Sequence, residues 1–523
     1  MPRLAWFLVL ATGTLVHANT REGSNNPPCR FAPLYTEEDI VRDPSQFVRD
    51  VLFWDGQFVR PDIGYNHANG MSYDGTLLNQ ATGVAPAYGS GRHNFSAASK
   101  ESLHVMLLAQ VLAGSKGAAR VVSPESQKTA QRKAYEIMNQ KLGTYLAFNE
   151  TFPGFGGLLP WYNNTYAHLS PTNDWVDRLP ALDNGELLWA VYAAVEALSV
   201  SHDYQYRRLG ARWQEWLDYT KTTAAKLFYH GNGRVCAVIT LNQTLSPHNP
   251  AQNYTCEGDD LLDDPYEGEL FTWWLYFFSN DLSSSDRDAL WLKKRAKLQA
   301  TTYQDANIGP ITVQKGYWFS SHEQWKVLEM PYSDIPLINQ LFTNAEIART
   351  CNSALLKIPG MYASVNNITD DASAEILGYI SNAGIPSISF LPDQELDVIT
   401  PYATFPTFLV DETVGIVWYW AMLLGKKMQN PYGSTESERV DGKAVSSFVS
   451  WDSKITTIVA LLGGVRDLVR EKMRRDGVYD EFLSRIGDEY ARVFTDVKSG
   501  DGKLCLPTAR VRNAGLKDYT SCD

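Results

Sequence analysis

The chain has 523 residues, a formal net charge of −12, and 44% hydrophobic and 12% aromatic residues. The acidic balance argues against nucleic acids and anionic membranes as partners. It suits a neutral ligand such as a sugar, which aromatic side chains can bind. The length allows two or three domains or one large toroid.

The first residues have the pattern of a secretory signal peptide. Arg3 precedes a short apolar run over residues 4–16, and the small residue Ala18 follows. The run is too short to span a membrane comfortably, which argues against an anchor. We therefore predict a signal peptide over residues 1–18, a single catalytic domain over residues 19–523 and a secreted protein.

The cysteines and glycosylation motifs fit that route. An even count of six cysteines in a secreted chain predicts disulfides, and no spacing matches a zinc site. Cys236–Cys256 and Cys505–Cys522 would close short loops, which leaves Cys29–Cys351. Sites for N-glycans are predicted at six asparagines: Asn94, Asn149, Asn163, Asn242, Asn253 and Asn367.

After an irregular, extended N-terminal region over residues 20–98, helical patterns alternate between two kinds. Helices that are apolar on every side must be buried, whereas helices with one charged face lie outside them. Amphipathic helices are predicted at about 124–148, 203–229, 283–301 and 467–497. Two further helices with a less distinct pattern are predicted near 335–355 and 371–382. An inner ring of apolar helices within an outer ring predicts an all-α fold, an (α/α)6 barrel or toroid, with long loops over one rim.

Acidic residues stand at the start of four apolar helices. These helices are predicted at 183–198, 267–280, 411–425 and 452–464, and their acids are Asp183, Glu186, Glu267, Glu269, Asp411, Glu412 and Asp452. Carboxylates are favoured at helix N-termini in any case, so each acid can be a simple cap. Their repetition at equivalent helix starts favours a functional rim, because caps are more often Ser, Thr or Asn.

A pair of carboxyl groups is what glycoside hydrolysis requires. One protonates the leaving oxygen, and the other activates water or attacks the sugar. Glu267 among aromatic residues suits the acid, since burial raises a carboxyl pKa. Asp452 suits the role of the second carboxylate. Two alternatives remain: Glu269 could be the acid in place of Glu267, or Asp441 and Glu257 could form the pair.

Long loops carry aromatic residues that can stack on sugar rings. We predict Trp175, Trp318 and Tyr362 as substrate contacts, together with Asp183, Glu186, Glu269 and Lys454. The scattered histidines predict no metal, and the chain has no phosphate-binding or dinucleotide-binding motif, so no cofactor is expected.

The stretches LDNGEL (182–187), DDPYEGEL (263–270) and FVSWDSK (448–454) resemble the fungal endo-β-1,2-glucanases of glycoside hydrolase family 162, distant relatives of bacterial family 144. The resemblance implies an inverting endo-hydrolase of β-1,2-glucan that works without metal. It implies Glu267 as general acid. It also implies Asp452 as the base, acting on water through a substrate hydroxyl group. We also expect the protein to be a monomer. The alternatives are another α/α-toroid enzyme, such as an exo-glucosidase or a polysaccharide lyase, or a non-catalytic glycan-binding protein.

Overall fold

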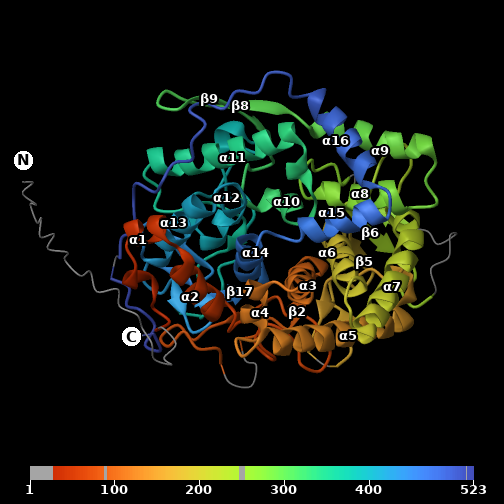
Figure 1. Cartoon of the computed structure of the whole chain (residues 1–523), viewed down its shortest axis with the longest axis horizontal. Helices are drawn as coiled ribbons and strands as arrows, with labels where there is room; N and C mark the ends of the chain where they lie inside the picture. Colours follow the sequence, from red (N-terminus) through yellow and green to blue (C-terminus); the bar gives the residue numbers. More distant parts are fainter. Residues whose placement is uncertain are drawn as a thin grey trace, which may run out of the picture.

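The computed structural model describes residues 28–522 except 87–90, 166, 247–253, 259, 371 and 514, so the predicted signal peptide lies outside the described residues. Within them the chain forms an α/α toroid, as predicted (Figure 1). The inner helices are α3 (Ala98–Leu112), α6 (Ala181–Ser199), α8 (Gly268–Phe278), α10 (Lys326–Glu329), α12 (Phe405–Val410) and α14 (Trp451–Leu461). The surrounding helices are α1 (Glu37–Arg42), α2 (Ser45–Asp55), α4 (Lys116–Val122), α5 (Gln127–Thr151), α7 (Tyr204–Phe228), α9 (Ser284–Lys297), α11 (Pro336–Leu355), α13 (Glu412–Leu423), α15 (Arg466–Arg475) and α16 (Tyr479–Ala491).

The inner helices pack closely because they are apolar on all sides. In α6 nearly every side chain is buried, and the helix lies between α3 and α8. Gly185 permits the approach to α8, since a Cβ atom there would lie 2.7 Å from the backbone nitrogen of Phe271. Any larger residue at this position would push the two helices apart.

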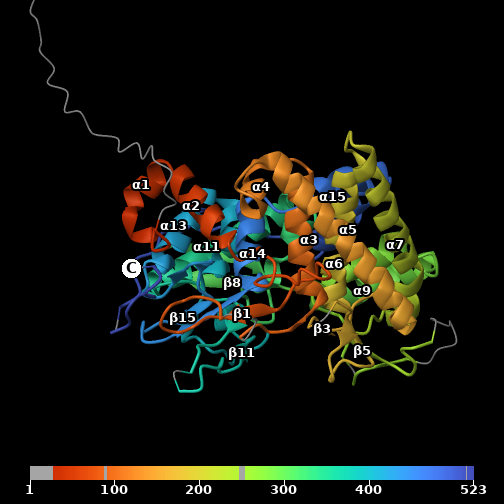
Figure 2. The same ribbon diagram turned by 90° about the horizontal axis from the view of Figure 1, so that it is seen from below.

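Short antiparallel strands lie on one side of the helices, as Figure 2 shows for β1, β3, β5, β11 and β15. Three strands lead directly into inner helices: β2 (Phe95–Ser96) into α3, β5 (Arg178–Pro180) into α6 and β17 (Phe448–Ser450) into α14. These strands therefore fix the N-terminal ends of the inner helices at this rim. The other strands are β1 (Gly75–Leu77), β3 (Tyr162–Asn163), β4 (Ser170–Pro171), β6 (Val238–Leu241), β7 (Tyr254–Cys256), β8 (Ala300–Asp305), β9 (Gly309–Gln314), β10 (Val365–Asn366), β11 (Tyr379–Ile380), β12 (Val398–Ile399), β13 (Gln429–Asn430), β14 (Gly433–Ser434), β15 (Ser437–Arg439) and β16 (Val445–Ser446).

The opposite rim is covered by α15, which packs against the C-terminal half of α6. The hydroxyl group of Tyr192 donates to Asp476 at 2.6 Å, and Arg475 forms an ion pair with Glu196 at 2.6 Å. The strand-bearing rim thus presents the N-termini of the inner helices. No helix of the described residues is both long and apolar enough to cross a membrane.

Four sequence predictions about helices were wrong. The region before residue 98 contains α1 and α2, and residues 371–382 form turns and β11 instead of a helix. The charged C-terminal segment is two helices, because Gly477 between them has a φ of 74°. The apolar helix at 411–425 is the outer helix α13. It follows the inner helix α12, and its exposed Asp411 caps its own first turn by accepting from the backbone N–H of Val414.

The disulfides join Cys29 to Cys522, Cys236 to Cys256 and Cys351 to Cys505. The prediction for Cys236–Cys256 is confirmed, and the other two predicted pairs were wrong. The C-terminal tail, residues 497–522, runs back over the toroid. It brings Cys505 to the end of α11 and Cys522 to the N-terminal segment, with Cα–Cα distances of 4.8 and 5.1 Å. A prediction that pairs cysteines close in sequence cannot anticipate that the C-terminal tail reaches these distant segments.

Two of the three disulfides, Cys351–Cys505 and Cys236–Cys256, close loops of different length and are therefore expected to stabilise the fold to different extents. Their sequence separations are 154 for Cys351–Cys505 and 20 for Cys236–Cys256. A cross-link that closes a longer loop removes more entropy from the unfolded chain, a difference of about 2 kcal/mol here. Replacing Cys351 and Cys505 by Ser should therefore lower the thermal unfolding midpoint more than the same change at Cys236 and Cys256. Equal midpoints at one scan rate would contradict this expectation.

Candidate active site

Four carboxyl groups lie at or near the starts of three inner helices at the strand-bearing rim. Asp183 and Glu186 belong to the first turns of α6, Glu267 immediately precedes α8, and Asp452 is the second residue of α14. Glu186, Glu267 and Asp452 are buried. The charge of Asp183 raises the pKa of the other three, the charge of Asp452 raises that of Glu267, and the charge of Glu267 raises that of Glu186, which places the four acids in one electrostatic cluster.

Glu267 does not serve as a helix cap. The carboxylate of Asp264 does so instead, accepting from the backbone N–H groups of Gly268 at 2.7 Å and Tyr266 at 3.1 Å. The Oε2 atom of Glu267 is buried and has no hydrogen-bond partner among the described residues. A buried carboxyl oxygen without a structural partner is available for a reaction.

The surroundings of Glu267 favour its protonated form. Burial, followed by the negative charges of Asp264 and Glu323, holds the pKa of Glu267 well above its ordinary value. The N-terminus of α8 acts in the opposite direction, but burial and like charges outweigh it. A basic side chain, His322, lies close by, with its Nε2 atom 3.7 Å from Oε1 of Glu267. Burial lowers the pKa of His322 to about 4, so at neutral pH this ring carries no charge that would ionise Glu267.

The side chain of Asp452 does not cap its helix either. Ser450 caps α14 by accepting from the backbone N–H of Ser453 at 3.2 Å. The Oδ2 atom of Asp452 lies 3.0 Å from Nζ of Lys100 on α3, whereas Oδ1 is buried and has no partner among the described residues. Burial raises the pKa of Asp452 and Lys100 lowers it, with burial the larger effect.

Asp183 and Glu186 differ in their partners. The indole N–H of Trp161 donates to Oδ2 of Asp183 at 3.0 Å. Burial and then the charge of Glu267 hold the pKa of Glu186 well above its ordinary value, and its Oε2 has no partner in the described structure. Glu186 is therefore neutral over a wider pH range than an ordinary glutamate.

An aromatic stack lies beside this cluster. The rings of Trp161 and Trp175 are stacked at 5.5 Å, Phe95 stacks on the other side at 6.2 Å, and Arg178 lies over Trp175 at 4.4 Å. Trp175 thus joins the cluster through Trp161. Among the described residues the other two predicted aromatic contacts have different neighbours: Tyr362 donates to the backbone of Leu396, and Trp318 contacts Tyr317.

The structure places two predicted site residues in buried ion pairs with other side chains. Glu269 pairs with Lys326 at 3.3 Å and accepts from Tyr332 at 2.6 Å. Lys454 pairs with Asp55 at 2.7 Å and is fully buried.

The alternative acids do not form a pair. Glu257 contacts Arg178, and Asp441 lies on the surface with Arg439 and Lys443.

Several residues of the cluster were missed from the sequence. The charge of Asp452 contributes to raised pKa values at Tyr379, Tyr402 and Glu436, which come from the loops between α11 and α14. The position of Lys100 in the sequence does indicate a role. A lysine in the first turn of an apolar helix opposes the helix dipole and needs a compensating anion.

The described residues offer little for a metal ion. The one group with suitable ligand atoms is His230 with Cys236 and Cys256, and both cysteines are used in a disulfide.

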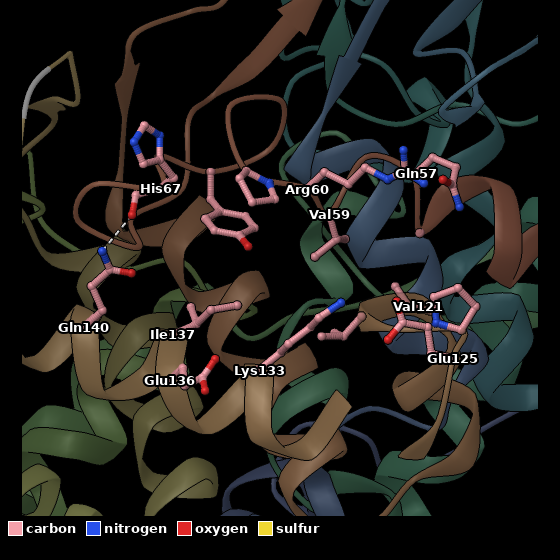
Figure 3. Close-up of a pocket in the computed structure, with 15 residues that line it drawn as sticks. Gln57, Val59, Arg60, His67, Val121, Glu125, Lys133, Glu136, Ile137 and Gln140 are labelled. Atoms are coloured by element: carbon pink, nitrogen blue, oxygen red, sulfur yellow. Dashed lines mark hydrogen bonds between the residues drawn. The ribbon is translucent and has the colours of Figure 1, made fainter. Parts of the chain in front are cut away.

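A hollow of about 510 Å³ lies elsewhere, between residues 56–67 and helices α4 and α5 (Figure 3). Its polar residues include Arg60, Lys133 and Glu136, but neither Glu267 nor Asp452 lines it.

Comparisons with known proteins found one family and several solved structures that are similar to the chain. The family described as endo-β-1,2-glucanase SGL, glycoside hydrolase family 162, matches residues 71–523. The endo-β-1,2-glucanase from Talaromyces funiculosus, solved with sophorose, is 55% identical with a TM-score of 0.93, over 95% of this chain and 100% of that chain. A mutant of that enzyme, solved with β-1,2-glucan, is 54% identical over the same shares, also with a TM-score of 0.93. The endo-β-1,2-glucanase from Chitinophaga pinensis is 14% identical over 84% of this chain and 98% of that chain, and its TM-score of 0.57 reflects the shared fold. No curated protein is similar enough to count as a match.

Proposed function

Since the chain belongs to the SGL family of endo-β-1,2-glucanases and is a glycoside hydrolase, we propose that it cleaves β-1,2-glucan internally, with inversion, at the strand-bearing rim. The observation that carries this proposal is that two buried carboxyl groups at the starts of inner helices, Glu267 and Asp452, cap neither helix, each keep one oxygen without a partner among the described residues, and share one electrostatic cluster. Their different surroundings support different roles.

In the proposed reaction, protonated Glu267 gives its proton to the glycosidic oxygen as the bond to the anomeric carbon breaks. Ionised Asp452 takes a proton from water, through a hydroxyl group of the substrate, while the water oxygen attacks the opposite face of that carbon. Asp183, Glu186 and the Trp161–Trp175 stack are proposed to bind the neighbouring glucose units.

We also propose that the protein is secreted. Three disulfides among the described residues support an oxidising compartment. Five of the predicted glycosylation sites fall on described residues, and Asn163 and Asn242 are exposed; Asn253 lies outside them. A monomeric state remains a prediction.

The substrate assignment is tested by incubating the protein with linear β-1,2-glucan, laminarin, cellulose and starch. We expect short sophoro-oligosaccharides from the first substrate alone, released as the α-anomer, which proton NMR resolves before mutarotation. Glucose or disaccharide released only from chain ends would favour an exo-glucosidase, and unsaturated products a lyase. Binding without any new reducing ends would favour a glycan-binding protein.

A further inference from the structure

Lys100 is a largely buried cation beside the proposed base. It lies in the first turn of α3, its Nζ is 3.0 Å from Oδ2 of Asp452, and the two side chains are 15% and 10% exposed. The same Nζ lies 5.9 Å from the ring centre of Trp161, beside Asp183. We propose that Lys100 is a positioning residue, which holds Asp452 by Oδ2 so that Oδ1 remains free to accept the proton during hydrolysis.

The position of Lys100 in the helix supports a functional reason for this contact. The N-terminus of a helix repels a cation, and burial adds a further cost. Asp452 compensates both, so the ion pair connects the start of α3 to the start of α14. Because Lys100 occupies Oδ2, Oδ1 is the carboxylate oxygen left to accept the proton that the substrate hydroxyl group passes on from water. Oδ1 has no hydrogen-bond partner among the described residues, as this role requires.

Lys100 also balances an otherwise negative environment. The charged and titratable groups that act with Asp452 are Lys100 on α3, Asp74 before β1, Asp183 on α6, Glu267 before α8, Tyr379 on β11, Tyr402 before α12 and Glu436 before β15. His93 pairs with Asp74 at 3.0 Å. Lys100 opposes the effects of burial and of Asp74 on the pKa of Asp452. Without this cation the pKa of Asp452 rises further, so the base loses its charge at a higher pH.

The expected results distinguish positioning from simple structural support. Lys100→Met should lower kcat about 10- to 100-fold with little change in KM, because the base is no longer held in place. The acidic limb of the pH profile of kcat/KM should move up by about one pH unit or more. Lys100→Arg keeps the cation, so its acidic limb should stay near that of the wild type even if its rate falls. Lys133→Met, at a half-buried lysine that contacts Ser123 on the outer side, is the control and should change neither.

This inference rests on the proposed function, and the two fail in different ways. If Asp452→Asn keeps activity, the assignment of the base is wrong. If Asp452→Asn is inactive but Lys100→Met and Lys100→Arg share the wild-type acidic limb, only the role of Lys100 is overturned. A carbon-13 NMR titration of Asp452 gives a readout without substrate. The titration should show a higher pKa in Lys100→Met than in the wild type, and an unchanged pKa would also overturn the inference.

Discussion

Replacing Glu267 by Gln is expected to lower kcat on β-1,2-glucan by about 10²- to 10⁴-fold while the fold is retained. The amide has nearly the same shape but no acidic proton to give to the leaving oxygen. Since the raised pKa of Glu267 keeps this proton in place up to an unusually high pH, the wild type should lose activity as the pH rises through that pKa. The variant should not show this basic limb. Steady-state rates across pH measure both effects.

The chain supplies its own matched control two residues away. Glu269→Gln makes the same chemical change on the same helix, but at a carboxylate that pairs with Lys326. Removing one partner of a buried pair costs about 3 kcal/mol or more, so this variant should unfold at a lower temperature yet turn over normally while folded.

A second test uses an aryl glycoside of a β-1,2-gluco-oligosaccharide, whose phenolate departs without full protonation. Glu267→Gln should be far less impaired on this substrate than on glucan. Equal impairment, or an inactive folded Glu269→Gln, would contradict the assignment of the acid.

The sequence shows which helices are buried, but it does not show whether a buried helix lies in the inner ring or is covered by other parts of the chain. The runs that became α6, α8 and α14 were recognised because they are apolar on every side. The same feature misplaced α13, which is outer but covered by the ends of the chain. Its Trp418 donates to the backbone of Cys505 and its Trp420 to that of Ala32. The inner helix of this part of the ring is α12, which directly precedes α13. It has only six residues, and the inner helix α10 has only four, which is too few to show a helical period in the sequence.

The candidate acids were easier to predict than their surroundings. Glu267 and Asp452 could be singled out because each opens a buried helix. Whether such an acid is a cap depends on its neighbours, and Asp264 and Ser450 take that task here, whereas Asp411 does cap α13. That distinction depends on hydrogen bonds that no spacing reveals. The same holds for Lys100, which is far from Asp452 in sequence and meets it only when the ring of helices closes.

Replacing Asp452 by Asn should also lower kcat by about 10²- to 10⁴-fold, because the amide cannot accept a proton from water. Asp441→Asn is the matched control. Its carboxylate lies on the surface with Arg439 and Lys443, so the change should leave the rate within about twofold of the wild type. Activity in Asp452→Asn together with its loss in Asp441→Asn would move the base to Asp441.

Azide separates the role of a base from that of a nucleophile or a binding group. Azide is already an anion, so it can attack the anomeric carbon without giving up a proton. If Asp452 only activates water, azide should restore activity in Asp452→Asn and form an α-glycosyl azide, inverted relative to the substrate. A nucleophilic Asp452 would work by two inversions, so the wild type would release the β-anomer. An Asp452 that only binds sugar would show a raised KM, with no rescue by azide. Inverted azide product formed only by Asp452→Asn, together with release of the α-anomer by the wild type, would therefore identify this side chain as the base.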